Sequence, residues 1–259
     1  MKTQKLRVTA KTFHGLENFL AEELVNTGAR DIRILNRAVQ FTGDKAAVYA
    51  ANYRCRTALR LLTEIAFFKA HNEDYLYRKA KEIPWNKYFD TEQSFAVNKT
   101  VNSKFFKHSH FAALKLKDAV ADFFNKKHGK RPSVDIKKPD IVINLHISET
   151  KVNISLDTSG EPLYKRGYRK KSLSAPLNEV LAAGIIKAAN RKPETECFFD
   201  PMCGSGTIPA EFIMAQLNIP PGYYRKAYAF QNFKDYDEAL FKKIKASADA
   251  NISYETSHK

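Results

Sequence analysis

The spacing of apolar residues predicts a small α+β unit over about the first fifty residues of the chain. Leu16, Leu20 and Leu24 recur at helical spacing, so they place one apolar face on a helix. The expected elements are strands at 5–10, 32–35 and 39–41, with a helix that begins near His14 and stops at Gly28. This unit shows no chemistry of its own.

The pattern from residue 44 to residue 157 predicts a helix-rich start followed by a strand, a helix and a hairpin. Apolar residues alternate along 141–147 and 151–156 on either side of a short polar turn, which is typical of a β-hairpin. We expect Trp85 in the core rather than as a base-stacking platform, because Trp is usually largely buried. The other expected elements are helices at 44–53, 74–82 and 111–124 and strands at 59–68 and 94–101.

The segment 157–162 (DTSGEP) has the composition of a linker and separates this region from the last part of the chain. Beyond it, the pattern predicts helices at 175–189, 208–217 and 236–248 and a buried strand at 197–199. A strand followed by a glycine turn and a helix is typical of α/β enzymes.

The charge of the chain points to an anionic partner. Lys and Arg outnumber Asp and Glu by 43 to 28 over 259 residues, a net charge of +15. Nucleic acid is the simplest partner for such a charge, and an anionic membrane surface is the second. No apolar stretch reaches the roughly 20 residues of a membrane span, and the first residues lack the apolar core of a signal peptide. Cys55, Cys197 and Cys203 form neither a disulfide framework nor a metal-ligand spacing, which favours a reduced, cytoplasmic protein without a metal.

Two stretches concentrate the positive charge. Between Lys99 and Lys138 there are eleven Lys and Arg residues against three acidic ones, and residues 161–171 carry five cations and one anion around two tyrosines. Cations beside aromatic rings suit a phosphate track with base stacking, although an exposed basic face would have the same composition. The candidate RNA contacts are Lys104, Lys107, Lys115, Lys117, Lys165, Arg166, Tyr168 and Arg169.

The stretch 198–209 (FFDPMCGSGTIP) is the strongest candidate for chemistry. Its Asp-x3-Gly-x-Gly pattern is one way in which α/β enzymes hold nucleotide-type cofactors, since glycines allow backbone N–H groups to approach the ligand. A P-loop is excluded because no Lys follows Gly206, and a dinucleotide fingerprint would need a small residue in place of Pro209.

Three segments resemble the THUMP-domain class I RNA methyltransferases, and most closely those that make N2-methylguanosine in bacterial 23S rRNA. They are LYKRGYR (163–169), APLNEVLAAGII (175–186) and FFDPMCGSGTIPAEFIMA (198–215), in the order and spacing of that family. The resemblance implies an α+β N-terminal region, ferredoxin-like plus THUMP, followed by the first part of an α/β Rossmann-like methyltransferase domain. The implied domain ranges are 1–43, 44–158 and 159–259.

The resemblance also implies S-adenosylmethionine as cofactor and RNA, which is rRNA in this family, as partner. The residues that it places at the cofactor are Asp200, Met202, Gly204, Gly206 and Thr207 in the loop and Pro176, Leu177 and Glu179 in the preceding segment. Cys203 belongs to the loop in this family and is not expected to act as a nucleophile.

One departure from the family pattern limits the prediction. The family holds the target amine with an Asn-Pro-Pro-Tyr motif, and this sequence contains none, so no catalytic residue is assigned. Asp235 and Asp237 fit a cap of the last helix better than a cofactor ribose. We therefore expect a chain that is inactive alone, resembling the first two-thirds of a longer enzyme. A non-catalytic RNA-binding module and a DNA adenine-N6 methylase are the alternatives.

Overall fold

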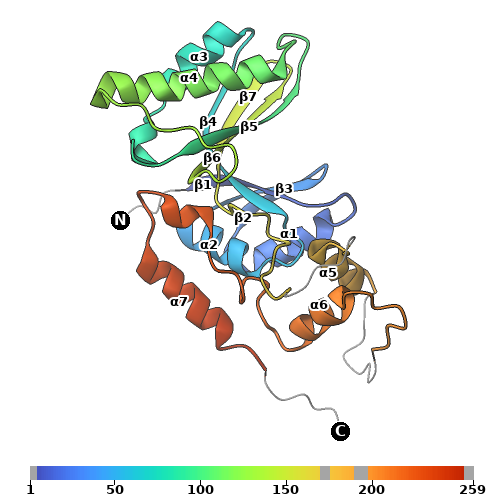
Figure 1. Cartoon of the computed structure of the whole chain (residues 1–259). Coiled ribbons are helices and arrows are strands. Elements are labelled where there is room, and N and C mark those ends of the chain that lie inside the picture. Colours follow the sequence, from blue (N-terminus) through green and yellow to red (C-terminus); the bar gives the residue numbers. More distant parts are fainter. Residues whose placement is uncertain (1–4, 170–175, 190–197, 254–259) are drawn as a thin grey trace. The chain divides into compact units, whose positions relative to one another are not determined.

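The computed structural model describes residues 5–169, 176–189 and 198–253 (Figure 1). They form two compact units, each built from separate stretches of the chain. The first unit contains 1–61, 161–227 and 237–259, and the second contains 62–160 and 228–236. The helix that follows Gly43 falls in the first unit together with the first strands.

The first unit is built on an antiparallel sheet of strand order β2-β3-β1. The inward residues Val8, Ala10, Val39 and Phe41 are fully buried and alternate with more exposed residues along β1 and β3. Figure 1 shows α1 and α2 on one side of these strands. The elements are β1 (Leu6–Lys11), α1 (Glu17–Val25), β2 (Arg30–Leu35), β3 (Ala38–Gly43) and α2 (Lys45–Arg54).

Three later helices complete the first unit: α5 (Glu179–Ala188), α6 (Thr207–Gln216) and α7 (Glu238–Asp249). Helix α7 packs on α2, where the ring of Phe241 lies edge-on to Tyr49 at 5.9 Å. The Asp237 side chain caps α7 by accepting from the N–H of Leu240 at 2.9 Å, which confirms the cap expected at this residue.

Two expectations for this part of the chain are wrong. Helix α5 begins at Glu179 rather than near Ala175, because the Asn178 side chain accepts from the N–H groups of Val180 and Leu181 and so fixes the start of the helix. The strand expected at 197–199 is not formed by Phe198 and Phe199, and Cys197 lies outside the described residues. Among the described residues after Asp157 no strand offers backbone partners, and Phe199 is 81% exposed.

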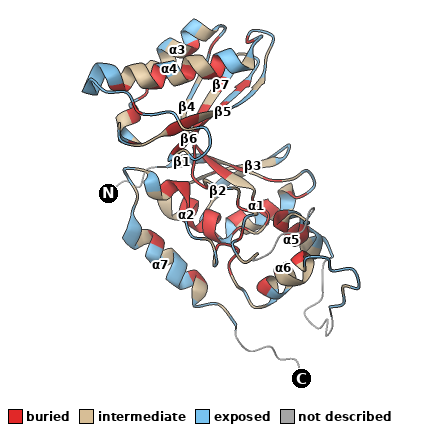
Figure 2. Cartoon of the chain, viewed as in Figure 1, coloured by how far each residue is buried: buried red, intermediate tan, exposed pale blue. Residues whose placement is uncertain are grey.

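The second unit is a sheet of strand order β4-β7-β6-β5 with α3 and α4 packed on it. Only β5 and β6 run parallel, and α4 connects them, so the predicted strand, helix and hairpin are confirmed. Figure 2 shows α4 buried along one face and exposed along the other. The elements are β4 (Arg60–Lys69), α3 (Glu73–Lys81), η1 (Trp85–Lys87), β5 (Phe95–Asn102), α4 (Ser109–His128), β6 (Ile141–Ser148), β7 (Lys151–Asp157) and η2 (Ala229–Asn232).

Trp85 lies in the core of the second unit, as predicted. It is fully buried, and its indole N–H donates to the Ala80 carbonyl at 2.8 Å. The expected linker is also buried at its start: Asp157 is fully buried and accepts from the backbone N–H groups of Ser159 and Gly160. The N–H of Phe230 donates to Thr158 at 3.0 Å, which brings 228–236 into this unit.

Candidate functional site

The glycine loop lies immediately before α6, in the first unit. Gly204 and Gly206 have φ values of 54° and 73°, the left-handed region that favours glycine. A Cβ built on either residue would meet no atom within 4 Å, so the loop backbone faces open space. Because α6 begins at Thr207, its unpaired N-terminal N–H groups lie at the same place.

A cavity of about 240 Å³ lies against this loop. Two stretches that are distant in sequence form its walls: Pro176 and Leu177 on one side, and the loop on the other. The lining residues are Pro176, Leu177, Asp200, Met202, Cys203, Gly204, Ser205, Thr207 and Ile208. The structure thus brings together most of the residues that the sequence placed at the cofactor.

Asp200 opens the loop and turns its carboxylate onto the loop backbone. Its Oδ1 accepts from the N–H of Met202 at 3.1 Å. A carboxylate has several acceptor sites, so this bond leaves capacity for a cationic group. Together with the α6 N-terminus, the cavity offers an acceptor for an ammonium group and donors for an anionic or polar group.

Arg169 lies behind the cavity and connects its two walls. On one side its Nε and Nη2 donate to Glu179 Oε1 at 3.1 and 2.8 Å, and Nη2 lies 3.3 Å from the Leu177 carbonyl. On the other side Nη1 donates to Ser205 Oγ at 2.9 Å and Nη2 to Thr207 Oγ1 at 3.0 Å. The Arg169 side chain is 19% exposed and Glu179 is buried, so water competes little for this pair.

A second ion pair, between Arg166 and Glu211, holds the segment before Arg169 against α6. Their side chains are 2% and 0% exposed, and Arg166 Nε donates to Glu211 Oε1 at 3.2 Å. Arg166 also donates to the carbonyls of Leu163 and Arg56. Among the described residues, Glu211 Oε2 has no hydrogen-bond partner, so the network is incomplete on that side.

Tyr168 and Gly167 complete this segment. The Tyr168 hydroxyl donates to Glu211 Oε1 at 3.2 Å, and burial, followed by the nearby Glu211 charge, raises the pKa of the phenol. Gly167 has φ 96°, and a Cβ there would collide with the Tyr224 carbonyl. Only glycine fits this turn.

These positions bear on two sets of predicted site residues. Glu179 was placed at the cofactor by resemblance, but its Oε1 pairs with Arg169 and it is absent from the cavity lining. Arg166 and Tyr168 were predicted to contact RNA, and a direct contact would require the Glu211 network to open. Lys165 is half-exposed and pairs with Glu161 at 2.8 Å. RNA contact by these side chains stays a prediction.

Some of the predicted RNA-binding residues of the second unit form ion pairs within the protein, and others are exposed. Lys115 pairs with Asp74 at 2.9 Å and Lys117 with Asp118 at 3.0 Å. Lys104 and Lys107 are exposed and flank Phe105, whose ring is 48% exposed. The Lys104–Lys107 segment thus combines two exposed cations with an exposed aromatic residue.

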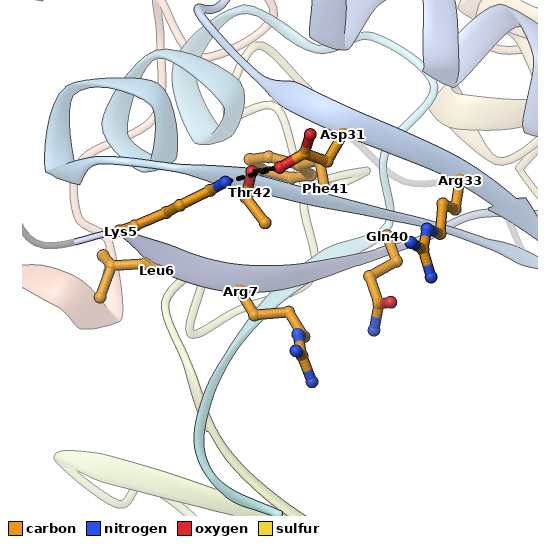
Figure 3. A pocket seen from close by; sticks show the side chains of 8 residues that line it. All are labelled: Lys5, Leu6, Arg7, Asp31, Arg33, Gln40, Phe41 and Thr42. Atoms are coloured by element: carbon orange, nitrogen blue, oxygen red, sulfur yellow. Dashed lines mark hydrogen bonds and ion pairs between the residues drawn. The ribbon is translucent and has the colours of Figure 1, made fainter.

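A further cationic surface lies on the face of the β2-β3-β1 sheet that α1 and α2 leave uncovered. Figure 3 shows Arg7, Arg33 and Gln40 pointing the same way from three neighbouring strands. They line a cavity of about 570 Å³ together with Lys5, Leu6, Asp31, Phe41 and Thr42. Lys5 pairs with Asp31 at 2.7 Å, and this hydrogen bond, followed by one from Thr42, lowers the pKa of the Asp31 carboxyl. The sequence analysis missed this surface because its cations are scattered along the chain and meet only in the sheet.

Other kinds of site find no support in the described ranges. No cluster of three or more His, Cys, Asp or Glu side chains could hold a metal ion there. None of the helices in the described part of the chain combines the length and apolar character of a bilayer span. Cys55 is buried, which raises the pKa of its thiol, and Cys203 is exposed in the loop.

We predict that Glu211→Ala destabilises the protein by about 3 to 5 kcal/mol, because it leaves the buried Arg166 charge without its partner. Urea unfolding followed by circular dichroism measures the change. Glu161→Ala is the matched control, since it removes an exposed pair from the same segment and should cost less than about 1 kcal/mol. Equal effects of the two substitutions would contradict a structural role for the buried pair.

The comparisons with known proteins match the three regions in order. Residues 7–62 match the RlmL ferredoxin-like domain, 70–157 the THUMP domain and 166–257 the RMKL-like methyltransferase domain. A Synechocystis protein named "Putative RNA methyltransferase slr0064" is 39% identical over 241 residues, which are 93% of this chain and 62% of the relative. The chain thus spans less than two thirds of the length of that relative.

Solved structures show the same fold. A Listeria monocytogenes protein described as a predicted N6-adenine-specific DNA methylase is 27% identical, with a TM-score of 0.86 over 97% of this chain and 65% of that one. SMU.472, described as a putative methyltransferase complexed with SAH, is 28% identical, with a TM-score of 0.84 over 98% of this chain and 67% of that one. TrmN from Thermus thermophilus shares the fold at 21% identity, with a TM-score of 0.64 over 82% of this chain and 62% of that one. The chain thus contains, in this order, regions that match the ferredoxin-like, THUMP and methyltransferase domain models.

Proposed function

We propose that the glycine loop binds S-adenosylmethionine and that the protein serves the methylation of RNA. The observation that carries the proposal is the cavity between Pro176-Leu177 and the loop, with open glycine backbone and Asp200 at its edge. The SMU.472 relative, which is described as a complex with SAH, supports this cofactor.

The residues present fit one end of such a cofactor. Asp200 would receive the ammonium of the methionine moiety, and the backbone N–H groups of Thr207 and Ile208, at the start of α6, would meet its carboxylate. The cavity, at about 240 Å³, is smaller than the roughly 300 to 1,000 Å³ of most ligand pockets. It has room for part of the cofactor, and the described residues hold that part.

We propose the exocyclic N2 amine of a guanine in RNA, in 23S rRNA by resemblance, as the acceptor. When bound, the cofactor supplies an electrophilic methyl group, and the target base must be flipped or single-stranded to reach it. The chain contains no Asn-Pro-Pro-Tyr to orient the amine. We therefore propose that these 259 residues bind cofactor and RNA, in the cytoplasm, without turnover.

We assign the RNA contact in the first place to the Lys104–Lys107 segment. Two exposed cations can contact phosphates while the Phe105 ring stacks on a base. The open sheet face with Arg7 and Arg33 is the second surface, since its three cations and one acid leave a net positive charge.

Gly206→Val should weaken binding of S-adenosylhomocysteine at least about tenfold, because the side chain fills the open face of the loop and disfavours φ 73°. Isothermal titration calorimetry measures the affinity. Gly129→Val is the matched control: it has φ 68°, open space around a Cβ, and a place at the end of α4 outside the cavity. Wild-type and Gly206→Val proteins with equal affinity would refute the site. No binding by either protein would favour the non-catalytic RNA-binding module.

The double substitution Lys104→Gln and Lys107→Gln should weaken RNA binding and reduce the salt dependence. Each lost phosphate contact lowers the slope of log K against log salt by about 0.7 to 0.9. Fluorescence anisotropy with a labelled 23S rRNA fragment over a salt series measures both quantities. Arg33→Gln tests the sheet face in the same assay, and Lys243→Gln, an exposed cation of α7, is the control. An unchanged slope in the double variant would remove the segment from the interface.

Purified chain incubated with S-adenosylmethionine and rRNA should transfer no methyl group, because it contains no Asn-Pro-Pro-Tyr to orient the acceptor amine. Radiolabel from the cofactor, counted in precipitated RNA, measures transfer. Cofactor-dependent labelling of rRNA would overturn the proposed inactivity. Excess affinity for duplex DNA over rRNA at matched salt would instead favour the DNA adenine methylase, which the description of the Listeria relative suggests.

A further inference from the structure

We infer that Arg169 is a positioning residue of the cofactor loop, holding the two walls of the cavity at a fixed separation. The inference rests on the proposed cofactor site and goes beyond it by assigning a role to a side chain outside the cavity lining. It also gives Arg169 a task other than contact with RNA.

The Arg169 guanidinium can donate hydrogen bonds to both walls of the cavity. Its three nitrogens form a planar fork with five N–H donors, which can serve partners on two sides at once. One edge serves Glu179 and Leu177, at the start of α5, and the other serves Ser205 and Thr207, at the start of α6. A lysine ammonium at this position could not donate to all of these acceptors in the same geometry.

The residues that accept hydrogen bonds from Arg169 include residues that line the cavity. Leu177 lines one wall of the cavity, and Ser205 and Thr207 line the other. The two hydroxyl oxygens lie 3.2 Å apart, so Arg169 fixes both the loop and the first helical residue after it. A shift of either wall would break bonds to the same guanidinium.

The chain segment that carries Arg169 is itself held in place. Arg166, three residues earlier, is anchored in the buried network with Glu211, which belongs to α6 itself. The backbone that carries Arg169 is thereby tied to the helix whose N-terminus it positions. This ion pair therefore restricts the position of the Arg169 guanidinium.

Arg169→Lys tests the inference, with S-adenosylhomocysteine as the probe in calorimetry. We expect at least about a tenfold loss of affinity, since several charge-assisted hydrogen bonds are lost, while RNA affinity by anisotropy changes less than about twofold. Arg225→Lys is the matched control: Arg225 also donates to several backbone carbonyls, those of Glu161, Pro162, Lys165 and Ala227, and it is not among the residues that line the cavity. Its loss of affinity for the probe should stay below about twofold.

A second variant approaches the same contacts from the loop. Ser205→Ala with Thr207→Val removes the two acceptors of Arg169 on the loop side and leaves Glu179 and Leu177 in place, so it decides the question if Arg169→Lys fails to fold. Combined with Arg169→Gln, the loss of affinity should fall short of the product of the separate losses, because both remove one interaction. A purely structural role would not produce this coupling.

The outcomes separate the inference from the proposed function. Wild-type protein that binds the probe, with Arg169→Lys and the loop variant binding it equally well, would overturn the role of Arg169 and leave the cofactor site standing. A loss of RNA affinity with unchanged probe affinity in Arg169→Lys would assign the residue to RNA instead. Absence of probe binding by the wild-type chain would refute the cofactor site and the positioning role with it.

Discussion

The buried pair of Arg166 and Glu211 is the constraint on which the candidate site depends. Two charges that water cannot reach are stable only if they stay together, so this pair fixes the segment 163–169 on α6. Gly167 makes the turn that follows, and Arg169 then arrives between the start of α5 and the glycine loop. We infer that the separation of the cavity walls depends on an ion pair that lies outside the cavity lining.

The sequence predicted most elements because each has a strong local cause. Alternation along β6 and β7 reflects one buried face, and helix starts such as that of α7 have a capping side chain. The start of α5 differs from the prediction through a local cap by Asn178, whereas the other failures depend on long-range contacts. Phe198 and Phe199 have the composition of a strand, but a strand needs a neighbour, and none follows Asp157 in the described ranges. Burial of Asp157 and its neighbours depends on residues 228–236, which no local pattern connects to them.

The candidate site shows the same division. Pro176, Leu177 and the glycine loop could be predicted because motif and resemblance name them, and the structure brings them to one cavity. The cations of 161–171 look like an RNA track in composition, and the structure instead shows Arg166 and Arg169 paired with Glu211 and Glu179. The composition of the segment shows its charge but not its ion-pair partners, because Glu179 and Glu211 lie ten and forty-five positions after the arginines that they pair with. RNA contact by the cations of 161–171 stays a prediction, and the proposal starts from exposed side chains, on the second unit and on the sheet face of the first.

Protection of Cys203 from alkylation tests most directly whether the loop holds the cofactor. Cys203 is exposed and lines the cavity, whereas Cys55 is buried and serves as an internal reference. Iodoacetamide labelling of a Cys197→Ser variant, followed by mass spectrometry, gives the rate at each thiol with and without S-adenosylhomocysteine. The account predicts rapid labelling of Cys203 that slows as the ligand saturates, with Cys55 unlabelled throughout. Labelling of Cys203 at one rate whatever the ligand concentration would contradict it.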